Sequence, residues 1–82
     1  MNTEESVIHV VCEVLQIPER VSNMNQSTEL LGAIPEFDSM AVVSIITGLE
    51  DAFDIFIEDD EIDASMFETV GTLTKFMDQK LV

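Results

Sequence analysis

The fold is decided by one amphipathic stretch, FDSMAVVSIITGLEDAF, which occupies residues 37–53. At about 100° per residue, one arc of a helix collects its large apolar side chains, namely Val42, Ile45, Ile46, Leu49 and Phe53. Asp38 comes immediately before this run, where a carboxylate can accept hydrogen bonds from the N–H groups of the first turn. The spacing predicts a helix over about 39–53, with Asp38 as its N-cap.

The remaining arc of this helix is unusually apolar for a surface that faces solvent. It contains Ser39, Met40, Val43, Ser44, Thr47, Glu50 and Asp51. Gly48 lies between the two arcs. Because Gly costs up to ~1 kcal/mol relative to Ala inside a helix, we expect Gly48 to mark a place of close packing.

Apolar stripes at helical spacing also occur near both ends of the chain. One predicts a helix over about residues 4–16, which is capped by Thr3 and cannot continue past Pro18. The other predicts a helix over about 70–81, which is capped by Thr69. Both stripes can pack against the central helix.

The segments between the helices carry apolar residues in polar surroundings. Residues 21–37 form a long loop with four apolar anchors that are expected to be packed, namely Leu30, Leu31, Ile34 and Phe37. Residues 53–57, FDIFI, have the composition of a strand but lack a partner strand, so they are predicted to be a loop that carries core residues. Residues 58–64 are expected to form a short helix with acids at its positive end.

These elements predict an all-α fold, a small bundle of three main helices plus one short helix. The length of 82 residues fits one domain, which we assign to residues 1–82. Hydrophobic residues make up 46% of the chain and its mean hydropathy is +0.25, so enough apolar mass is available for a core. No apolar run approaches the ~18 residues of a membrane span, and a cytoplasmic protein is expected.

The charge is strongly negative and excludes classes of partner. The chain has seventeen acidic and three basic residues, which gives a formal net charge of −14. Residues 21–74 contain twelve acidic residues and no Lys or Arg. Nucleic-acid binding needs Lys and Arg to neutralise phosphates, and binding to anionic membranes needs the same residues. We therefore expect no nucleic-acid partner. The chain is also expected to be a monomer without a membrane span.

No constellation of catalytic or metal-binding residues is found in the sequence. Cys12 and His9 are the only residues of their kinds, which leaves no zinc site and no disulfide, and Cys12 is interpreted as a core residue. A Ser39–His9 pair for nucleophilic catalysis is disfavoured because His9 lies on the first helix. An EF-hand in the acidic stretch fails at Ala64 and Val70, where Gly and Glu are needed. The chain is not expected to be an enzyme or to bind a metal.

What remains is a serine at the start of the central helix. Ser39 would project its hydroxyl beside unsatisfied N–H groups and the positive end of the helix dipole, where a phosphate is electrostatically favoured. The common interpretation is a capping Asp38 followed by a polar first residue that has no function. The acidic body, the long loop before the motif and the amphipathic helix after it favour a function.

The motif and its surroundings resemble the acyl carrier protein family. The resemblance rests on EFDSM at 36–40, Val43, Ile46, LEDAFD at 49–54, and Ile57. The family has Asp-Ser-Leu at its modified serine, followed by a helix that ends in a Leu-Glu-x-x-Phe-like segment, and the third residue of the triplet is Met here. The resemblance covers nearly the whole chain.

The resemblance implies that Ser39 carries 4′-phosphopantetheine, attached from coenzyme A by a magnesium-dependent phosphopantetheinyl transferase. The thiol of this arm would carry an acyl group as a thioester and present it to partner enzymes. Asp38 would fix the helix terminus and assist metal binding during the modification. Family members also enclose the acyl chain between helices, which would use Val43, Ile46 and Ile57 here.

In the family, the central helix docks onto basic patches of acyl-loading and acyl-using enzymes. The docking surface that the resemblance implies here is Met40, Val43, Ser44, Thr47, Glu50, Asp51 and Ile57. Ala41 and Ser44 stand where fatty-acid carriers have acids. Apolar contact at Met40 and Val43 is therefore expected to contribute more to docking, with steering by the later acids.

Three interpretations of the role stay open. The first is a free-standing acyl carrier in a specialised lipid, polyketide or envelope-related pathway. The second is a D-alanyl or other aminoacyl carrier, because residues 53–69 are also similar to the D-alanyl carrier proteins. The third is an unmodified acidic helical adaptor that binds a basic partner.

Overall fold

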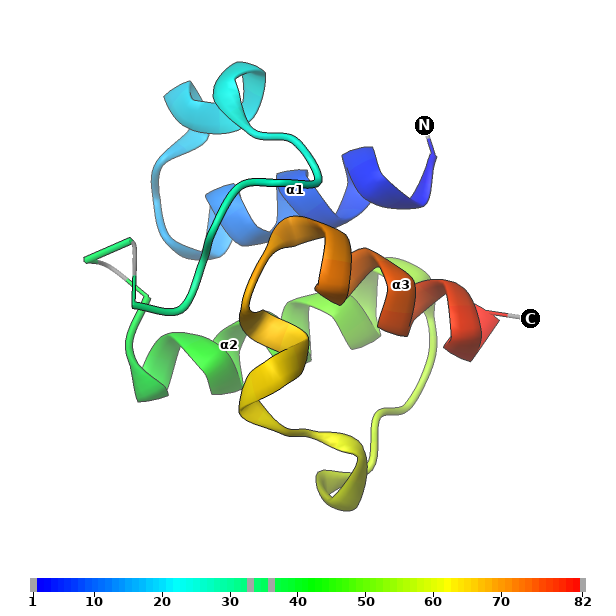
Figure 1. Cartoon of the computed structure of the whole chain (residues 1–82). Coiled ribbons are helices and arrows are strands. Elements are labelled where there is room, and N and C mark those ends of the chain that lie inside the picture. Colours follow the sequence, from blue (N-terminus) through cyan, green and yellow to red (C-terminus); the bar gives the residue numbers. More distant parts are fainter. Residues whose placement is uncertain (1, 33, 36, 82) are drawn as a thin grey trace.

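The computed structural model describes residues 2–32, 34–35 and 37–81. Its long helices are α1 (Thr3–Val14), α2 (Ser39–Phe53) and α3 (Val70–Leu81). Its short 3-10 turns are η1 (Pro18–Asn23), η2 (Asp59–Glu61) and η3 (Ala64–Phe67). Figure 1 shows the helices gathered around a common centre, with η1 at the top of the view and η2 at the bottom. The described residues contain no strand beyond an isolated bridge between Glu29 and Thr69, and the all-α fold class is confirmed.

Helix α1 begins one residue before the expected start, because its cap is Asn2 and not Thr3. The Asn2 side-chain oxygen accepts a hydrogen bond from the backbone N–H of Glu5 at 2.8 Å, and Thr3 is the first helical residue. The helix ends at Val14, earlier than expected, since Gln16 adopts a left-handed backbone conformation (φ 60°). The capping preference of Asn equals or exceeds that of Thr, which accounts for the shift.

Helix α2 has the predicted bounds, Ser39–Phe53. Asp38 caps it as expected, since its Oδ1 accepts from the backbone N–H of Ala41 at 2.9 Å. At the other end, Asp54 takes the left-handed conformation (φ 55°) and its N–H donates to the Glu50 carbonyl, which closes the last turn.

Helix α3 also has the predicted bounds, and Thr69 caps it. The Thr69 hydroxyl oxygen accepts from the N–H of Thr72 at 3.1 Å, and the Thr72 hydroxyl oxygen accepts from the N–H of Thr69 at 3.0 Å. The long loop supplies a carbonyl acceptor for the first turn of α3, because Gly71 N–H donates to the Gln26 carbonyl at 2.8 Å. The loop is thereby attached to the start of α3.

The segment expected as one short helix over 58–64 contains the turn η2, then extended backbone, and then only the first residue of a second turn, η3. Asp63 is the reason for the break. Its backbone is extended (φ −143°, ψ 167°), and its side chain accepts from the N–H groups of Ser65 and Met66, so it begins a new turn and does not continue the old one.

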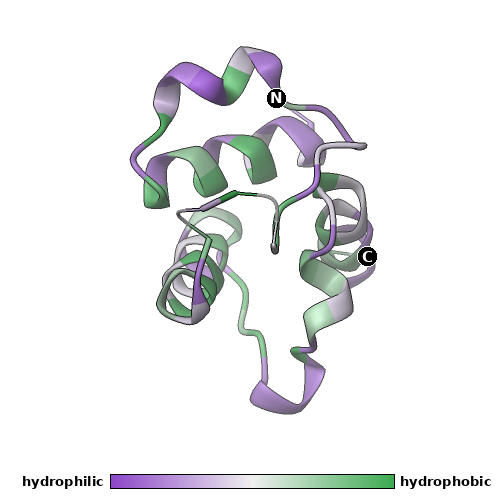
Figure 2. Cartoon of the chain, turned by 60° about the vertical axis from the view of Figure 1, so that its left-hand side comes forward, coloured by the Kyte–Doolittle hydropathy of each residue, from purple (hydrophilic) through white to green (hydrophobic). Residues whose placement is uncertain are grey.

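One hydrophobic core joins all three helices, and α1 packs directly against α2 and α3. Cys12 is fully buried within it, and desolvation raises the pKa of its thiol, in agreement with a core role. The loop supplies Leu30, Ile34 and Phe37 as buried anchors, whereas Leu31 is 41% exposed and was wrongly expected to be packed. Figure 2 shows hydrophilic turns at the top and the bottom of the molecule.

Gly48 marks a close approach of α2 to α1, as expected. A Cβ at this position would lie 3.0 Å from the Val10 side chain and 3.4 Å from that of Val14. The helix pair therefore packs more closely at this point than any side chain on residue 48 would allow without movement.

Candidate functional site

Ser39 is the first residue of α2 and is exposed to solvent. Asp38 before it is turned to the helix, where its carboxylate holds the N–H of Ala41. The serine hydroxyl therefore lies at the positive end of a fifteen-residue helix. This placement agrees with the sequence prediction for Ser39 and Asp38, while Glu36 of the quoted motif lies outside the described residues.

A shallow, largely apolar groove of about 400 Å³ opens beside Ser39. Its lining combines the N-terminal part of α2 with the loop before it and with η3: Leu31, Ser39, Val42, Ile62, Asp63, Ala64 and Phe67. Leu31, which is exposed and not part of the core, thus borders this groove.

A second groove of about 310 Å³ shares Val42 and Ile62 with the first. Its other lining residues come from α2 and the segment after it: Val43, Ile46, Thr47, Glu50, Phe56, Ile57 and Asp59. Val43, Ile46 and Ile57, which the sequence analysis grouped for an enclosed acyl chain, therefore do meet at one groove. Because the two grooves share Val42 and Ile62, they lie next to each other between α2 and the segment that contains η2 and η3.

Most residues predicted for docking lie on the open side of α2. Met40 is 77% exposed and Val43 is 66% exposed, and the other exposed members of this set are Ser44, Thr47 and Asp51. They form one surface that a partner could reach.

Ile57 was wrongly assigned to the docking surface, because its side chain is only 3% exposed. Its N–H donates to the Glu50 carboxylate at 2.8 Å, which draws the loop back against α2. Glu50 is accordingly half-buried, with Oε2 engaged inside the protein. Ile57 therefore lies beneath the surface predicted for docking, whereas the docking role of the half-buried Glu50 stays a prediction.

Phe56 is an exposed apolar residue that the sequence analysis missed. It is 70% exposed, whereas Phe53 and Ile55 are half-buried and Ile57 is buried. In the sequence, every residue of FDIFI except Asp54 is apolar. Phe53 ends α2 and Asp54 is left-handed, so no strand-like alternation runs through the segment to distinguish Phe56 from its neighbours.

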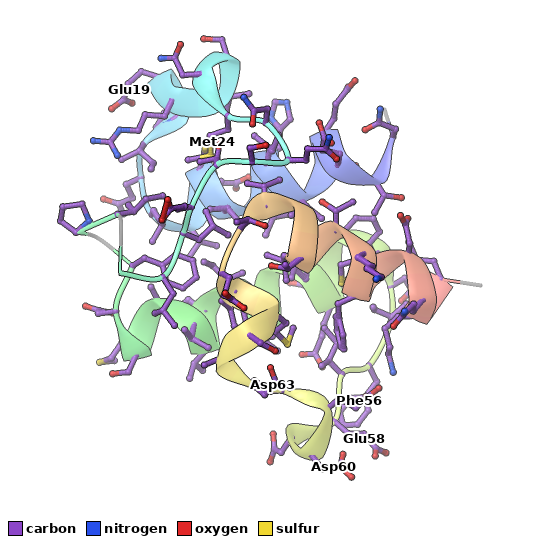
Figure 3. All side chains as sticks on the ribbon, viewed as in Figure 1. Glu19, Met24, Phe56, Glu58, Asp60 and Asp63 are labelled. Carbon is purple, nitrogen blue, oxygen red and sulfur yellow. The ribbon has the colours of Figure 1, made fainter. Side chains whose placement is uncertain are left out.

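Acidic side chains occupy the edge of the molecule below this face. Figure 3 shows Phe56, Glu58 and Asp60 on that edge, with Asp63 nearer the ribbon of η3. The pKa of Glu61 is lowered, first by the backbone N–H of Glu58 and then by the Lys80 ammonium, whose Nζ lies 2.9 Å from Glu61 Oε2. Hydrogen bonding from Ser65 lowers the pKa of Asp63. No group of three or more metal-ligating side chains occurs among the residues described.

None of the helices that the structure describes has the length and apolar character needed to cross a membrane.

The chain is similar to acyl carrier proteins in sequence and structure, although no family model matches it. An acyl carrier protein of Sulfurovum sp. (strain NBC37-1) is 39% identical over 75 residues, which cover 90% of this chain and 92% of the relative. The acyl carrier protein of Wolinella succinogenes is 35% identical over 75 residues, with coverages of 90% and 91%. The solution NMR structure of a holo acyl carrier protein from Nitrosomonas europaea superposes with a TM-score of 0.91 at 48% identity, covering 99% of this chain and 98% of that one.

Proposed function

The chain belongs to the acyl carrier protein family, and from this membership we propose that Ser39 is the attachment point of a 4′-phosphopantetheine arm. Acyl carrier proteins are carriers and not catalysts. The proposed function is to hold an acyl group and to present it to enzymes that load or use it. The observation that carries this proposal is the exposed Ser39 at the N-terminus of α2.

The residues around Ser39 fit the arm. The positive end of α2 favours the negative charge of a phosphodiester at the serine oxygen. Asp38 keeps its carboxylate on the N–H of Ala41, so the cap stays in place beside the attached group. When bound, the arm supplies a thiol that carries the acyl group as a thioester. The two apolar grooves that meet at Val42 and Ile62 offer a surface for an apolar chain.

Attachment is proposed to need a partner enzyme, which supplies the base and the metal ion for the step. The Ser39 oxygen forms the new bond to the phosphorus that bears pantetheine, while the diphosphate bond of coenzyme A breaks and the nucleotide leaves. The proton of the hydroxyl passes to a base of a magnesium-dependent phosphopantetheinyl transferase. Asp38, next in sequence, is proposed to assist the metal during this step.

Partner enzymes are proposed to dock on the open side of α2. Met40 and Val43 supply apolar contact, Ser44 and Thr47 supply polar contact, and Asp51 steers basic patches toward the surface. The start of α2 carries no acid in its first turn, so this surface is less charged there than in fatty-acid carriers. We propose a specialised lipid, polyketide or envelope-related pathway on this ground, and location in the cytoplasm.

A D-alanyl or other aminoacyl carrier is the second candidate. The similarity of residues 53–69 to D-alanyl carrier proteins supports it. The same Ser39 and the same arm would then hold an amino acid. Loading the modified protein with a panel of acyl and aminoacyl donors distinguishes the two, because only the physiological partner enzymes transfer their own cargo at a high rate.

The proposed function is tested by intact-mass measurement after incubation with coenzyme A, magnesium and a broad-specificity transferase. We expect one added phosphopantetheine on the wild-type chain and none on Ser39→Ala. Ser22→Ala is the matched control, because it removes another exposed hydroxyl that lies on η1 and not on α2. If several transferases add nothing to the wild type, the unmodified adaptor is the better explanation.

A further inference from the structure

Phe56 is held outward by its two neighbours in the chain. It is 70% exposed between the half-buried Ile55 and the buried Ile57. A single exposed apolar side chain needs no explanation of its own, but exposed apolar residues that gather in one patch mark an interaction site. Phe56 is informative because it borders one groove together with the exposed Val43.

The backbone around Phe56 is clamped to a single residue of α2. The N–H of Ile55 donates to the Glu50 carbonyl at 3.1 Å, and the N–H of Ile57 donates to Glu50 Oε2 at 2.8 Å. These bonds lie on either side of Phe56, so its Cα has little freedom relative to α2. One oxygen of the Glu50 carboxylate, Oε2, is engaged in this bond inside the protein.

Phe56 extends the apolar part of the α2 surface. It borders the 310 Å³ groove together with Val43 and Thr47, which are exposed on the open side of the helix. Exposed acids flank Phe56 in the chain, namely Asp54, Glu58, Asp59 and Asp60, and Asp59 borders the same groove. An apolar centre with an anionic rim is complementary to an apolar pocket flanked by Lys or Arg.

We infer that Phe56 is a docking anchor for the enzyme that modifies Ser39, and that Glu50 positions this anchor without itself contacting the enzyme. The inference rests on the proposed function, because it takes the phosphopantetheinyl transferase as the partner. Phe56 and Val43 enter an apolar pocket of the transferase, and the acidic rim meets basic residues around that pocket. Aromatic side chains placed in this way supply much of the binding free energy of an interface.

The first test is steady-state arm transfer with coenzyme A and magnesium, measured on variants of the full chain. Phe56→Ala is expected to raise the KM for the carrier about tenfold or more, the range of an interface hot spot. The kcat should be unchanged, because Ser39 and its surroundings are untouched. Leu81→Ala is the matched control, since Leu81 is also an exposed apolar residue but lies at the end of α3.

The role of Glu50 is tested by two substitutions that differ in one property. Glu50→Gln removes the charge but retains an oxygen that can accept from Ile57 N–H, and its KM should stay within about twofold of wild type. Glu50→Ala removes the acceptor, so it should raise KM about as much as Phe56→Ala and speed deuterium uptake by the amides of residues 55–57. Equal losses in Glu50→Gln and Glu50→Ala would show a direct charge contact and overturn the positioning role.

Direct binding supplies a second readout. The affinity of the apo chain for the transferase, measured by calorimetry without coenzyme A, should fall in Phe56→Ala and Glu50→Ala and persist in Glu50→Gln. If wild type is never modified, the proposed function fails. If wild type is modified and Phe56→Ala keeps the wild-type KM and affinity, the docking inference alone is overturned.

Discussion

At the scale of single residues, Asp38 and Ser39 have separate roles at the start of α2: Asp38 caps the helix, and Ser39 presents a hydroxyl to solvent. The N–H groups of a first turn need acceptors, and the Asp38 carboxylate provides one at 2.9 Å from the N–H of Ala41. The Ser39 hydroxyl is thereby spared from capping and stays exposed. A serine in the capping position would turn its own oxygen toward the helix, so the order Asp-Ser matters for an accessible hydroxyl.

Gly71 is a residue whose replacement we expect to weaken the fold. A Cβ there would lie 2.7 Å from the carbonyl oxygen of Gln26, which itself accepts from Gly71 N–H at 2.8 Å. Gly71→Ala gains up to ~1 kcal/mol in helix propensity but must displace backbone, and overpacking of this kind costs about 1–3 kcal/mol. We expect a net loss in the free energy of unfolding, measured by urea titration.

Gly48→Ala is the comparison for this prediction. Its Cβ would meet the Val10 side chain at 3.0 Å, and a side-chain tip can move more easily than a carbonyl. The loss for Gly48→Ala should therefore be smaller than for Gly71→Ala. A Gly71→Ala chain as stable as wild type would show that the loop at Gln26 yields freely.

At the scale of elements, the sequence predicted the helices better than the turns. The bounds of α2 and α3 were predicted because their apolar periodicity and their caps, Asp38 and Thr69, agree. The turns η1 and η2 span six and three residues, too few for a period to appear in the sequence. The next turn, η3 (Ala64–Phe67), begins where the Asp63 side chain accepts from the N–H groups of Ser65 and Met66, a local contact that no periodicity indicates.

The candidate site was predicted in the same uneven way. Ser39 could be identified because it belongs to a helix start, which sequence rules describe well. That Ile57 is buried while Phe56 is exposed could not be predicted, because it depends on a hydrogen bond from Ile57 N–H to the carboxylate of Glu50, seven residues earlier. Tertiary contacts of this kind leave no local periodicity that distinguishes them.

The ion pair between Lys80 and Glu61 joins α3 to η2, and it should be visible in a titration. Both the N–H of Glu58 and the Lys80 ammonium lower the pKa of Glu61, in that order of size. A carboxylate with a depressed folded pKa stabilises the fold above its unfolded pKa, and this contribution is lost as pH falls through the folded pKa. We expect Lys80→Gln to raise the pKa of Glu61 but to leave it below its ordinary value, because the Glu58 N–H remains.

The measurement is an NMR pH titration of the Glu61 side-chain carboxyl carbon. Lys75→Gln is the control, since it changes the net charge equally and Lys75 makes no ion pair among the residues described. A pKa that moves as much in Lys75→Gln as in Lys80→Gln would mean that the general field of the protein, and not the contact, sets the shift.

At the scale of the whole molecule, the net charge of −14 is concentrated in a small volume. The molecule measures 29 × 27 × 20 Å, so at low ionic strength every carboxylate lies within about one Debye length, ~30 Å at 0.01 M, of most others. Only three basic residues offset seventeen acids. Compact folding therefore brings like charges together, which lowers the stability of the folded state.

Screening of this repulsion should stabilise the protein. Raising the salt from about 0.01 M to about 1 M shortens the Debye length to ~3 Å, and we expect the thermal midpoint to rise by several degrees, as ~1 kcal/mol does in a domain of this size. Asp60→Asn tests the cause, because Asp60 is exposed on the acidic edge: it should raise the midpoint at low salt and lose that advantage at high salt. If the thermal midpoint of the wild type does not change with salt concentration, the carboxylates are spaced widely enough for solvent to screen them without added ions.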